Sequence, residues 1–148
     1  MSLIVVGIDG SQSAETALRF ALEEARLRGA TLRIVTVWST PSTVYTGMVY
    51  VPTFDLREVE EQAASERLEA ARALVGDTPG VTIETVSVEG QTAGALVAEA
   101  AGADLLVVGS RGHGGFTNLL LGSVSQQVAH HAKVPLAIVR ASPSEPGK

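Results

Sequence analysis

The sequence contains no cysteine and only two lysines among its 148 residues. Without cysteine the chain can form no disulfide framework, no thiolate zinc site, no cysteine nucleophile and no redox Cys-x-x-Cys pair. The absence fits a reducing, intracellular compartment, and we expect a cytoplasmic protein. Acidic residues outnumber basic residues by 16 to 11, which gives a net charge of -5. A nucleic-acid-binding protein usually carries a basic face, so this balance argues against nucleic acid as a partner.

Long apolar stretches are also missing. A membrane-spanning helix needs a run of roughly 18 or more apolar residues, and no run approaches that length, so we expect no membrane span. The first residues carry no basic segment ahead of their short apolar run, unlike a signal peptide. Hydrophobic residues nevertheless make up 45% of the chain, which is typical of a globular domain. The length fits a single domain over residues 1–141, followed by a flexible C-terminal tail at 142–148.

Apolar residues follow two different spacings along the chain. Short runs rich in β-branched residues are typical of strands that are covered on both faces. A polar–apolar alternation at 81–88 predicts a strand that is less covered than the others. The sequence therefore predicts five strands, at residues 3–6, 32–38, 81–88, 104–109 and 136–139.

Helical spacing separates these strands. Apolar residues at i, i+3, i+4 and i+7 predict a helix that begins after an N-cap at Ser11 and stops at Gly29. Capping patterns predict further helices from Asp55, from a cap at Thr92, and from a capping box at Ser123. Strict alternation of strands and helices predicts an α/β domain: a single doubly wound parallel sheet with about four helices on its two faces.

Ligands of such sheets bind beyond the carboxyl ends of the strands, where the strand order reverses. If the first strand is central, this point lies between the first and the fourth strand. Asp9 and Gly109 stand at the ends of these two strands. The sequence thus places a candidate site before any motif is considered.

Five of the fifteen glycines fall between residues 109 and 122, at the end of the fourth strand. Glycines there allow positive φ and a close backbone approach, and successive N–H groups can form an anion-binding nest. The helix that follows adds free N–H groups and the positive end of its dipole. Ser123 and Ser125 add hydroxyl groups, and Arg111 can supply the cation that the scarce lysines do not. These are the parts of a phosphate site, with Gly112 and Gly115 inside the loop.

Several better-known phosphate and nucleophile motifs do not fit this loop. It has no internal Gly-Lys-Ser/Thr, so it is not a Walker A loop. It lacks the third glycine of the dinucleotide fingerprint, which in any case follows a first strand. No Gly-x-Ser-x-Gly occurs, so there is no nucleophile elbow.

The glycine spacing resembles the pattern G-x2-G-x9-G-(S/T) of the ATP-binding branch of the universal stress protein family. The residues that carry this resemblance are Gly109, Gly112, Gly122 and Ser123. The segments at 7–11 and 134–136 are also similar to that family, and the resemblance covers about residues 2–141. It implies a five-stranded parallel sheet in the order 3-2-1-4-5 that binds ATP, or AMP or ADP, over the first and fourth strands.

The resemblance also implies roles for individual residues. Asp9 would contact the ribose or a Mg or Mn ion that bridges the phosphates, and Val37 would meet the adenine with its backbone. The ribose and phosphates would be held by Gly109, Gly112, Gly122, Ser123, Val124 and Ser125. Dimers of the family form by antiparallel pairing of the last strands, so we expect a homodimer through Leu136, Ala137, Ile138 and Val139; these residues also form an apolar strand at a sheet edge.

Other interpretations of these residues stay open at this point. Asp9 can instead cap the first helix or satisfy loop amides, Ser123 can be a pure N-cap, and Arg111 can be a solvated surface residue. The connection at 39–54 is either a binding lid or a surface loop. The adjacent His130 and His131 point about 100° apart on a helix, which favours interaction with solvent and the helix dipole over a shared metal.

The loop offers a phosphate site without catalytic apparatus, since no lysine approaches the loop and no second carboxylate lies near Asp9 in sequence to act as a base. We therefore expect an ATP-binding stress-response or regulatory protein, in which nucleotide occupancy modulates a dimer or an unknown regulatory protein partner with little or no turnover. The alternative is a slow ATPase or an autophosphorylating enzyme that uses Ser123 or a neighbouring serine. A flavin or nicotinamide binder is a third hypothesis, which the missing fingerprint weakens.

Overall fold

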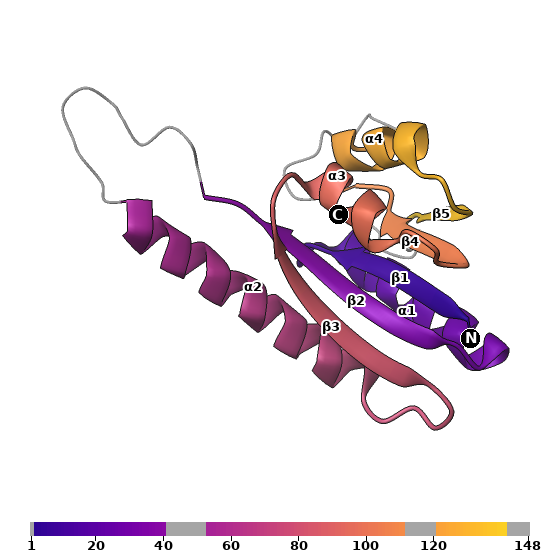
Figure 1. Ribbon diagram of the computed structural model, residues 1–148. Helices are drawn as coiled ribbons and strands as arrows, with labels where there is room; N and C mark the ends of the chain where they lie inside the picture. Colours follow the sequence, from indigo (N-terminus) through magenta and orange to yellow (C-terminus); the bar gives the residue numbers. More distant parts are fainter. Residues whose placement is uncertain (1, 41–52, 112–120, 142–148) are drawn as a thin grey trace, which may run out of the picture.

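The fold is a five-stranded, all-parallel sheet (Figure 1). The structure is a computed structural model that describes residues 2–40, 53–111 and 121–141, and only the backbone of 53–55. The predicted tail at 142–148 lies outside these residues. The strands are ordered β3-β2-β1-β4-β5, which confirms the predicted order. They span Leu3–Ile8 (β1), Thr31–Trp38 (β2), Thr82–Glu89 (β3), Leu105–Gly109 (β4) and Leu136–Val139 (β5).

Helices cover both faces of this sheet, as predicted (Figure 1). They span Gln12–Arg28 (α1), Thr53–Val75 (α2), Thr92–Glu99 (α3) and Ser123–His131 (α4). Side chains of α1 and α2 pack on one face, and side chains of α3 and α4 pack on the other. This division follows from the strand order. The chain runs outward from β1 to β2 and β3, and then in the other direction to β4 and β5. Because all crossovers are right-handed, the helices of these two halves lie on opposite faces.

Two apolar cores result, one on each face. Successive side chains of a strand point to opposite faces, so Ile4 and Val6 of β1 enter the α1–α2 core while Val5 enters the α3–α4 core. All three are fully buried. The outer strand β3 contains no buried residue, which agrees with the polar–apolar alternation of its sequence. The central strands are thus rigid supports for whatever lies at their carboxyl ends.

The ends of α1 are those that the sequence predicts. Ser11 is the N-cap, and its Oγ accepts a hydrogen bond from the N–H of Ala14 at 3.1 Å. Gly29 ends the helix in the left-handed conformation, with a φ of 62°. A residue with a Cβ is strained there, which explains why glycine stops this helix.

Three predicted helix starts are wrong. Helix α2 begins at Thr53, before Asp55. Helix α3 is capped at Gln91 rather than Thr92, because the N–H of Ala95 already bonds to the Gln91 carbonyl. Helix α4 is capped at Gly122 rather than Ser123. Its first turn is fixed from Gly122 onward, where the carbonyl accepts a hydrogen bond from the N–H of Gln126 at 3.0 Å.

Candidate functional site

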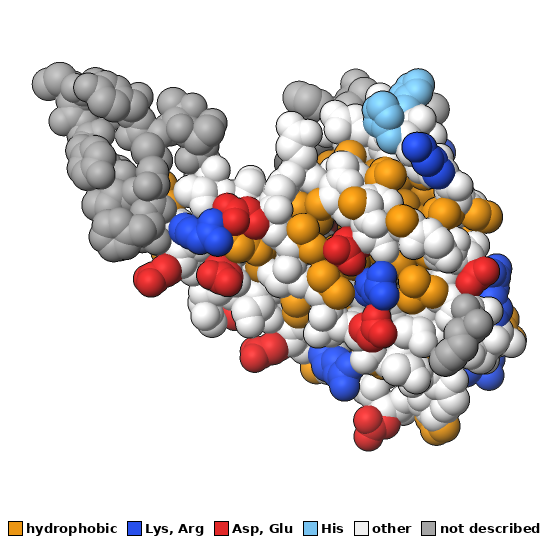
Figure 2. All heavy atoms as spheres, in the orientation of Figure 1, with side chains coloured by type: hydrophobic (Ala, Val, Ile, Leu, Met, Phe, Trp, Pro, Cys, Tyr) orange, Lys and Arg blue, Asp and Glu red, His pale blue; other side chains and the backbone are white. Residues whose placement is uncertain are grey.

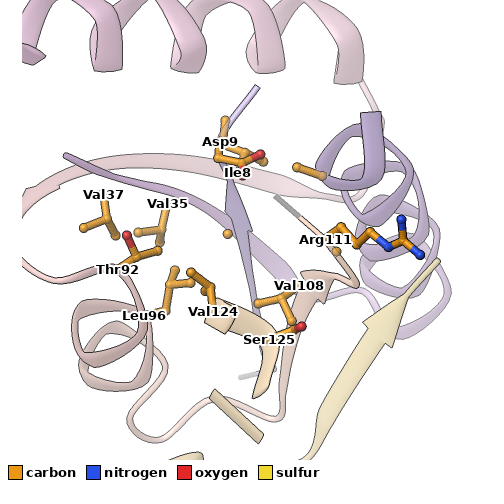
Figure 3. A pocket seen from close by; sticks show the side chains of 13 residues that line it. Ile8, Asp9, Val35, Val37, Thr92, Leu96, Val108, Arg111, Val124 and Ser125 are labelled. Carbon is orange, nitrogen blue, oxygen red and sulfur yellow. The ribbon is translucent and has the colours of Figure 1, made fainter. Parts of the chain in front are cut away.

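A hollow lies at the carboxyl ends of β1, β2 and β4, where the sequence places the site (Figure 3). Helices α3 and α4 close it from the side, and the start of α1 borders it. Its enclosed part measures about 60 Å³, which is well below the roughly 300–1,000 Å³ of pockets that bury a small ligand. It is lined by Gly7, Ile8, Asp9, Ala14, Val35, Val37, Thr92, Leu96, Val108, Gly109, Arg111, Val124 and Ser125.

One side of the hollow is apolar. Val35 and Val37 of β2, Leu96 of α3 and Val124 of α4 gather there, and Thr92 lies at their edge (Figure 3). A flat apolar group, such as a purine base, can be sandwiched between side chains of this kind. Asp9 and Arg111 lie away from this cluster, whereas Thr92 borders it (Figure 3).

The backbone carbonyl of Val37, like its side chain, lies where it can contact a ligand in the hollow. The carbonyl of its neighbour Trp38 faces β3, where it accepts a hydrogen bond from the N–H of Gly90 at 2.9 Å. Neighbouring residues of a strand present their backbone groups to opposite edges, so the carbonyl of Val37 faces β1. The last pair between β1 and β2 joins Ile8 to Thr36, so this carbonyl lies past the end of the ladder.

Asp9 holds the turn between β1 and α1. Its Oδ1 accepts a hydrogen bond from the N–H of Ser11 at 2.9 Å, and Gly10 between them has a φ of 86°, which favours glycine. The alternative role, in which Asp9 satisfies a loop amide, is therefore present in the structure. A carboxylate has two oxygens, so this bond leaves the side chain able to accept from a second partner.

The base of the glycine-rich loop is fixed by a small hydrogen-bonded cluster. The carbonyl of Ser110 accepts from the N–H of Gly122 at 2.6 Å and from the Oγ of Ser125 at 3.0 Å. That hydroxyl also lies 3.0 Å from the carbonyl of Gly122. Ser110 and Ser125 are both buried. The N–H of Gly122 and the hydroxyl of Ser125 thus already have hydrogen-bond partners within the protein.

Helix α4 begins without a side-chain cap. In the described part of the chain, no side chain accepts a hydrogen bond from its first N–H groups, whereas α1 has the Ser11 cap. The first N–H groups of a helix have no partner within the helix. Those of Ser123, Val124 and Ser125 therefore stay available, together with the positive end of the helix dipole.

Two glycines of the site lie where a Cβ would meet a neighbour: backbone atoms at Gly109, and the flexible end of the Leu96 side chain at Gly7. A Cβ on Gly109 would lie 2.6 Å from the Oγ of Ser13 and 2.8 Å from its backbone carbonyl group. A Cβ on Gly7 would lie 2.8 Å from both methyl groups of Leu96. Gly109 is not among the residues with positive φ and Gly122 has a φ of -77°, so these two glycines do not use the positive φ that glycine allows.

Arg111 lies at the opposite end of the hollow from Val37. Its N–H donates to the Oγ of Ser13 at 3.3 Å, and its carbonyl accepts from the Oγ of Ser11 at 3.5 Å. These bonds attach the segment after β4 to the start of α1. Its guanidinium points away from Asp9 and Val37 (Figure 3), so a phosphate contact requires a different rotamer.

The structure brings together most of the predicted site residues that it describes. The hollow is bordered by Asp9, Val37, Gly109, Arg111, Val124 and Ser125, but not by Gly122 or the exposed Ser123. Gly112, Gly115 and His113 lie outside the described residues, as does most of the 39–54 connection. Sequence reasoning missed Thr92 and Leu96 because it placed the site at the ends of the first, second and fourth strands and gave no role to the helix that follows the third strand.

A metal ion would find few protein ligands here. No group of three or more His, Asp or Glu side chains that could hold a metal occurs within 2–40, 53–111 and 121–141. His130 and His131 lie at the end of α4, seen at the top of Figure 2, with ring centroids 6.4 Å apart. Asp9 is thus a single carboxylate, which fits an ion held mainly by phosphate oxygens and water, the usual arrangement for Mg²⁺.

Comparison with known proteins decides the family. The model of the universal stress protein family matches residues 1–140. The chain belongs to this family. Universal stress protein Rv2005c of Mycobacterium tuberculosis is 39% identical over 139 residues, which cover 94% of this chain and 45% of the relative. Universal stress protein YxiE of Bacillus subtilis is 34% identical over 145 residues and is covered to 97%.

A solved universal stress protein in complex with cAMP has the same fold. It is 33% identical, with a TM-score of 0.64 over 95% of this chain and 98% of that one. The chain spans about half the length of the mycobacterial relatives it matches, which are covered to 45%. None of the helices described here has both the length and the apolar character needed to cross a membrane.

Proposed function

We propose that this universal stress protein binds an adenine nucleotide, ATP in the first place, at the carboxyl ends of β1, β2 and β4. The observation that carries the proposal is the uncapped start of α4, which lies beside a hollow with one apolar side. Free N–H groups at a helix start attract phosphate, and the apolar side suits a base. The solved relative in complex with cAMP supports an adenine nucleotide as the ligand class.

The base would enter between Val37 and Leu96. Adenine carries an amino group at its N6 position, which can donate to the carbonyl of Val37 past the end of β1. Guanine carries an oxygen at that position, so two acceptors would face each other. The site should therefore prefer ATP over GTP by at least about tenfold, because an unpaired polar contact costs about 1–3 kcal/mol.

The sugar and phosphates would extend from Asp9 toward the start of α4. Asp9 would accept from a ribose hydroxyl or hold a phosphate-bound Mg or Mn ion, while its Oδ1 keeps the bond to Ser11. The N–H groups of Ser123, Val124 and Ser125 would meet the phosphates. Gly109, Gly122 and Ser125 would act by shaping the loop base, and the roles of Arg111, Gly112 and Gly115 toward the phosphates stay part of the proposal. Backbone N–H groups would thus replace the missing lysines in a chain of net charge -5.

Because the enclosed space is only about 60 Å³, a nucleotide would lie over the mouth of the hollow. Such a ligand changes the exposed surface of the molecule, which suits a regulatory role in the cytoplasm with little or no turnover. A regulatory protein partner would then recognise the covered mouth. The alternative, slow hydrolysis or phosphorylation of Ser123, is favoured only by the exposure of that serine.

We also propose a homodimer through β5. This strand pairs with β4 on one side only, and its residues Leu136, Ala137, Ile138 and Val139 are half-buried. An apolar edge strand with free backbone groups is a template for a second strand. Light scattering should give twice the mass of one chain at micromolar concentration, and Ile138→Lys should shift the protein to a monomer. A monomeric wild-type protein would contradict this proposal.

The nucleotide site can be tested with one pair of charge variants. Ser123→Asp places a carboxylate at the start of α4, where it stabilises the helix but competes with phosphate for the N–H groups. Gln127→Asp adds the same charge at an exposed position further along α4. Titration calorimetry with Mg-ATP should show at least a tenfold loss of affinity for Ser123→Asp and less than a threefold change for Gln127→Asp.

The proposal fails if wild-type protein binds neither ATP nor AMP, or if ATP and GTP bind equally. Mass spectrometry of the small molecules that co-purify with the wild-type protein gives an independent readout. Release of phosphate from ATP, compared among wild type, Asp9→Ala and Gly122→Ala, distinguishes the enzymatic alternative; equal background rates in all three would remove it.

A further inference from the structure

A second, larger cavity lies on the other side of Ile8, between α1 and α2. It measures about 520 Å³, within the range of roughly 300–1,000 Å³ that is typical of ligand pockets. Ile8 and Ala14 border both this groove and the nucleotide hollow. Most of its lining is apolar, and the largest apolar side chains are Ile8, Leu18 of α1 and Leu74 of α2.

Arg67 of α2 is the one basic residue among the described residues that line the groove. Its side chain is half-buried, and its Nε donates to the Oγ1 of Thr36 at 2.9 Å. Thr36 is fully buried, and its own hydroxyl donates to the carbonyl of Ile8 at 3.1 Å. The guanidinium is thus held in place by a buried group on β2.

The charge of Arg67 has no counterion within the groove. Among the residues described by the structure, no carboxylate lies within ion-pair distance of it, although the other arginines of α1, β2 and the start of α2 do form ion pairs. Thr36 takes one of its five N–H donors. A fixed, half-buried guanidinium with unused donors is suited to bidentate binding of an anionic group.

We propose that the α1–α2 groove binds a small amphiphilic anion, with a carboxylate or sulfonate group on Arg67 and an apolar body between Leu18 and Leu74. The wall formed by Ile8 separates this ligand from the nucleotide hollow. The proposal does not depend on nucleotide binding, because it uses other residues and a different part of the surface.

Two acidic residues at the groove limit how strongly an anion is held. Glu15 forms an ion pair with Arg19 at 3.1 Å, and Glu66 accepts a hydrogen bond from the amide of Gln62 at 3.3 Å. Glu15 is therefore neutralised by its neighbour, whereas the charge of Glu66 is not. Removing the charge of Glu66 should tighten anion binding, with an effect that shrinks as salt screens it.

A matched pair of fluorescent probes tests the proposal. 1-Anilinonaphthalene-8-sulfonate carries the anionic group, and N-phenyl-1-naphthylamine has the same aromatic body without it. Fluorescence titration of the wild-type protein should show saturable, one-to-one binding of the sulfonate, at least tenfold tighter than the neutral probe.

Three variants should change the affinity for the sulfonate in different ways: one lowers it, one raises it and one is a control. Arg67→Met should weaken its binding at least tenfold and leave the neutral probe unchanged. Glu66→Gln should tighten binding of the sulfonate about twofold to fivefold. This variant keeps the bond between Arg67 and Thr36, so it tests the proposal even if Arg67→Met fails to fold. Arg72→Met is the control, since Arg72 lies on the same helix but bonds to the carbonyl of Ile83, away from the groove. Equal binding of both probes, non-saturable binding, or sulfonate binding that ignores both Arg67→Met and Glu66→Gln would overturn the proposal.

Discussion

The N–H of Gly122 donates to the carbonyl oxygen of Ser110 at 2.6 Å, across the two ends of the glycine-rich loop. This bond, together with the buried hydroxyl of Ser125, fixes the start of α4 relative to the end of β4. The base of the proposed phosphate site is therefore held together by hydrogen bonds within the protein. Residues at the loop base and residues at its surface should respond differently to substitution.

Ser125→Ala should lower the free energy of unfolding by about 0.5–1.5 kcal/mol, because it removes the buried hydroxyl that bonds to the carbonyls of Ser110 and Gly122, each of which keeps a backbone donor. Ser123→Ala, at an exposed position two residues earlier, should change stability by less than about 0.5 kcal/mol. Urea denaturation followed by circular dichroism measures both. Equal stability of the two variants would contradict the role that we assign to Ser125.

Gly109→Ala should destabilise the protein by about 1–3 kcal/mol, because the new Cβ would meet the backbone of Ser13 at 2.8 Å. Shortening the Ser13 side chain cannot relieve this contact, since backbone atoms take part. Gly94→Ala is the matched control: its Cβ would meet nothing within 4 Å, and alanine in a helix stabilises by about 0.5–1 kcal/mol. Thermal unfolding should therefore shift in opposite directions for the two variants.

Thr36→Val should destabilise the protein by about 1–3 kcal/mol although it hardly changes the shape of the side chain. The loss of the hydroxyl removes the donor to Ile8 and the acceptor of Arg67, both in or next to the core. Thr36→Ser keeps the hydroxyl and should recover much of that loss. Chemical denaturation of both variants tests this, and a Val variant as stable as wild type would show that the bonds contribute nothing net.

Asp9→Asn and Asp9→Ala should separate the structural role of Asp9 from its proposed ligand role. Asparagine can still accept from the N–H of Ser11, so stability should stay within about 0.5 kcal/mol of wild type. The loss of charge should nevertheless weaken binding of ATP in the presence of Mg more than in its absence. Alanine should lose stability as well. Calorimetric titrations with and without Mg provide the measurement; an equal loss in both conditions would argue against a metal contact.

Apolar spacing together with capping patterns was enough to predict a parallel sheet with helices on both faces, because burial on both faces leaves continuous apolar runs such as that of β4. The order of the strands was predicted only from the family resemblance. The α1 caps were also predictable, since Ser11 and Gly29 act on their own neighbours in sequence. The start of α4 was not. There the serine at 123 has the right local pattern, but a contact with Ser110 fixes the chain one residue earlier.

Long-range packing explains the other differences at the site. Glycine is needed at 109 because Ser13 of α1 packs against it. Leu96, which lines the hollow, comes from α3, far from the glycine-rich loop in sequence. Neither relationship leaves a local pattern. The groove beside Arg67 could not be predicted from the sequence for the same reason, because the sequence does not show which side chains lie near Arg67 in space.

The two outer strands of the sheet differ in length and polarity. Strand β3 presents eight residues with alternating polar side chains, whereas β5 presents four apolar residues. Only one side of the sheet is thus suited to extension by another chain. If two chains pair antiparallel through β5, each chain covers the β5 edge of the other. The resulting ten-stranded sheet would end in the polar strand β3 on both sides, so further chains could not add to it and form a filament.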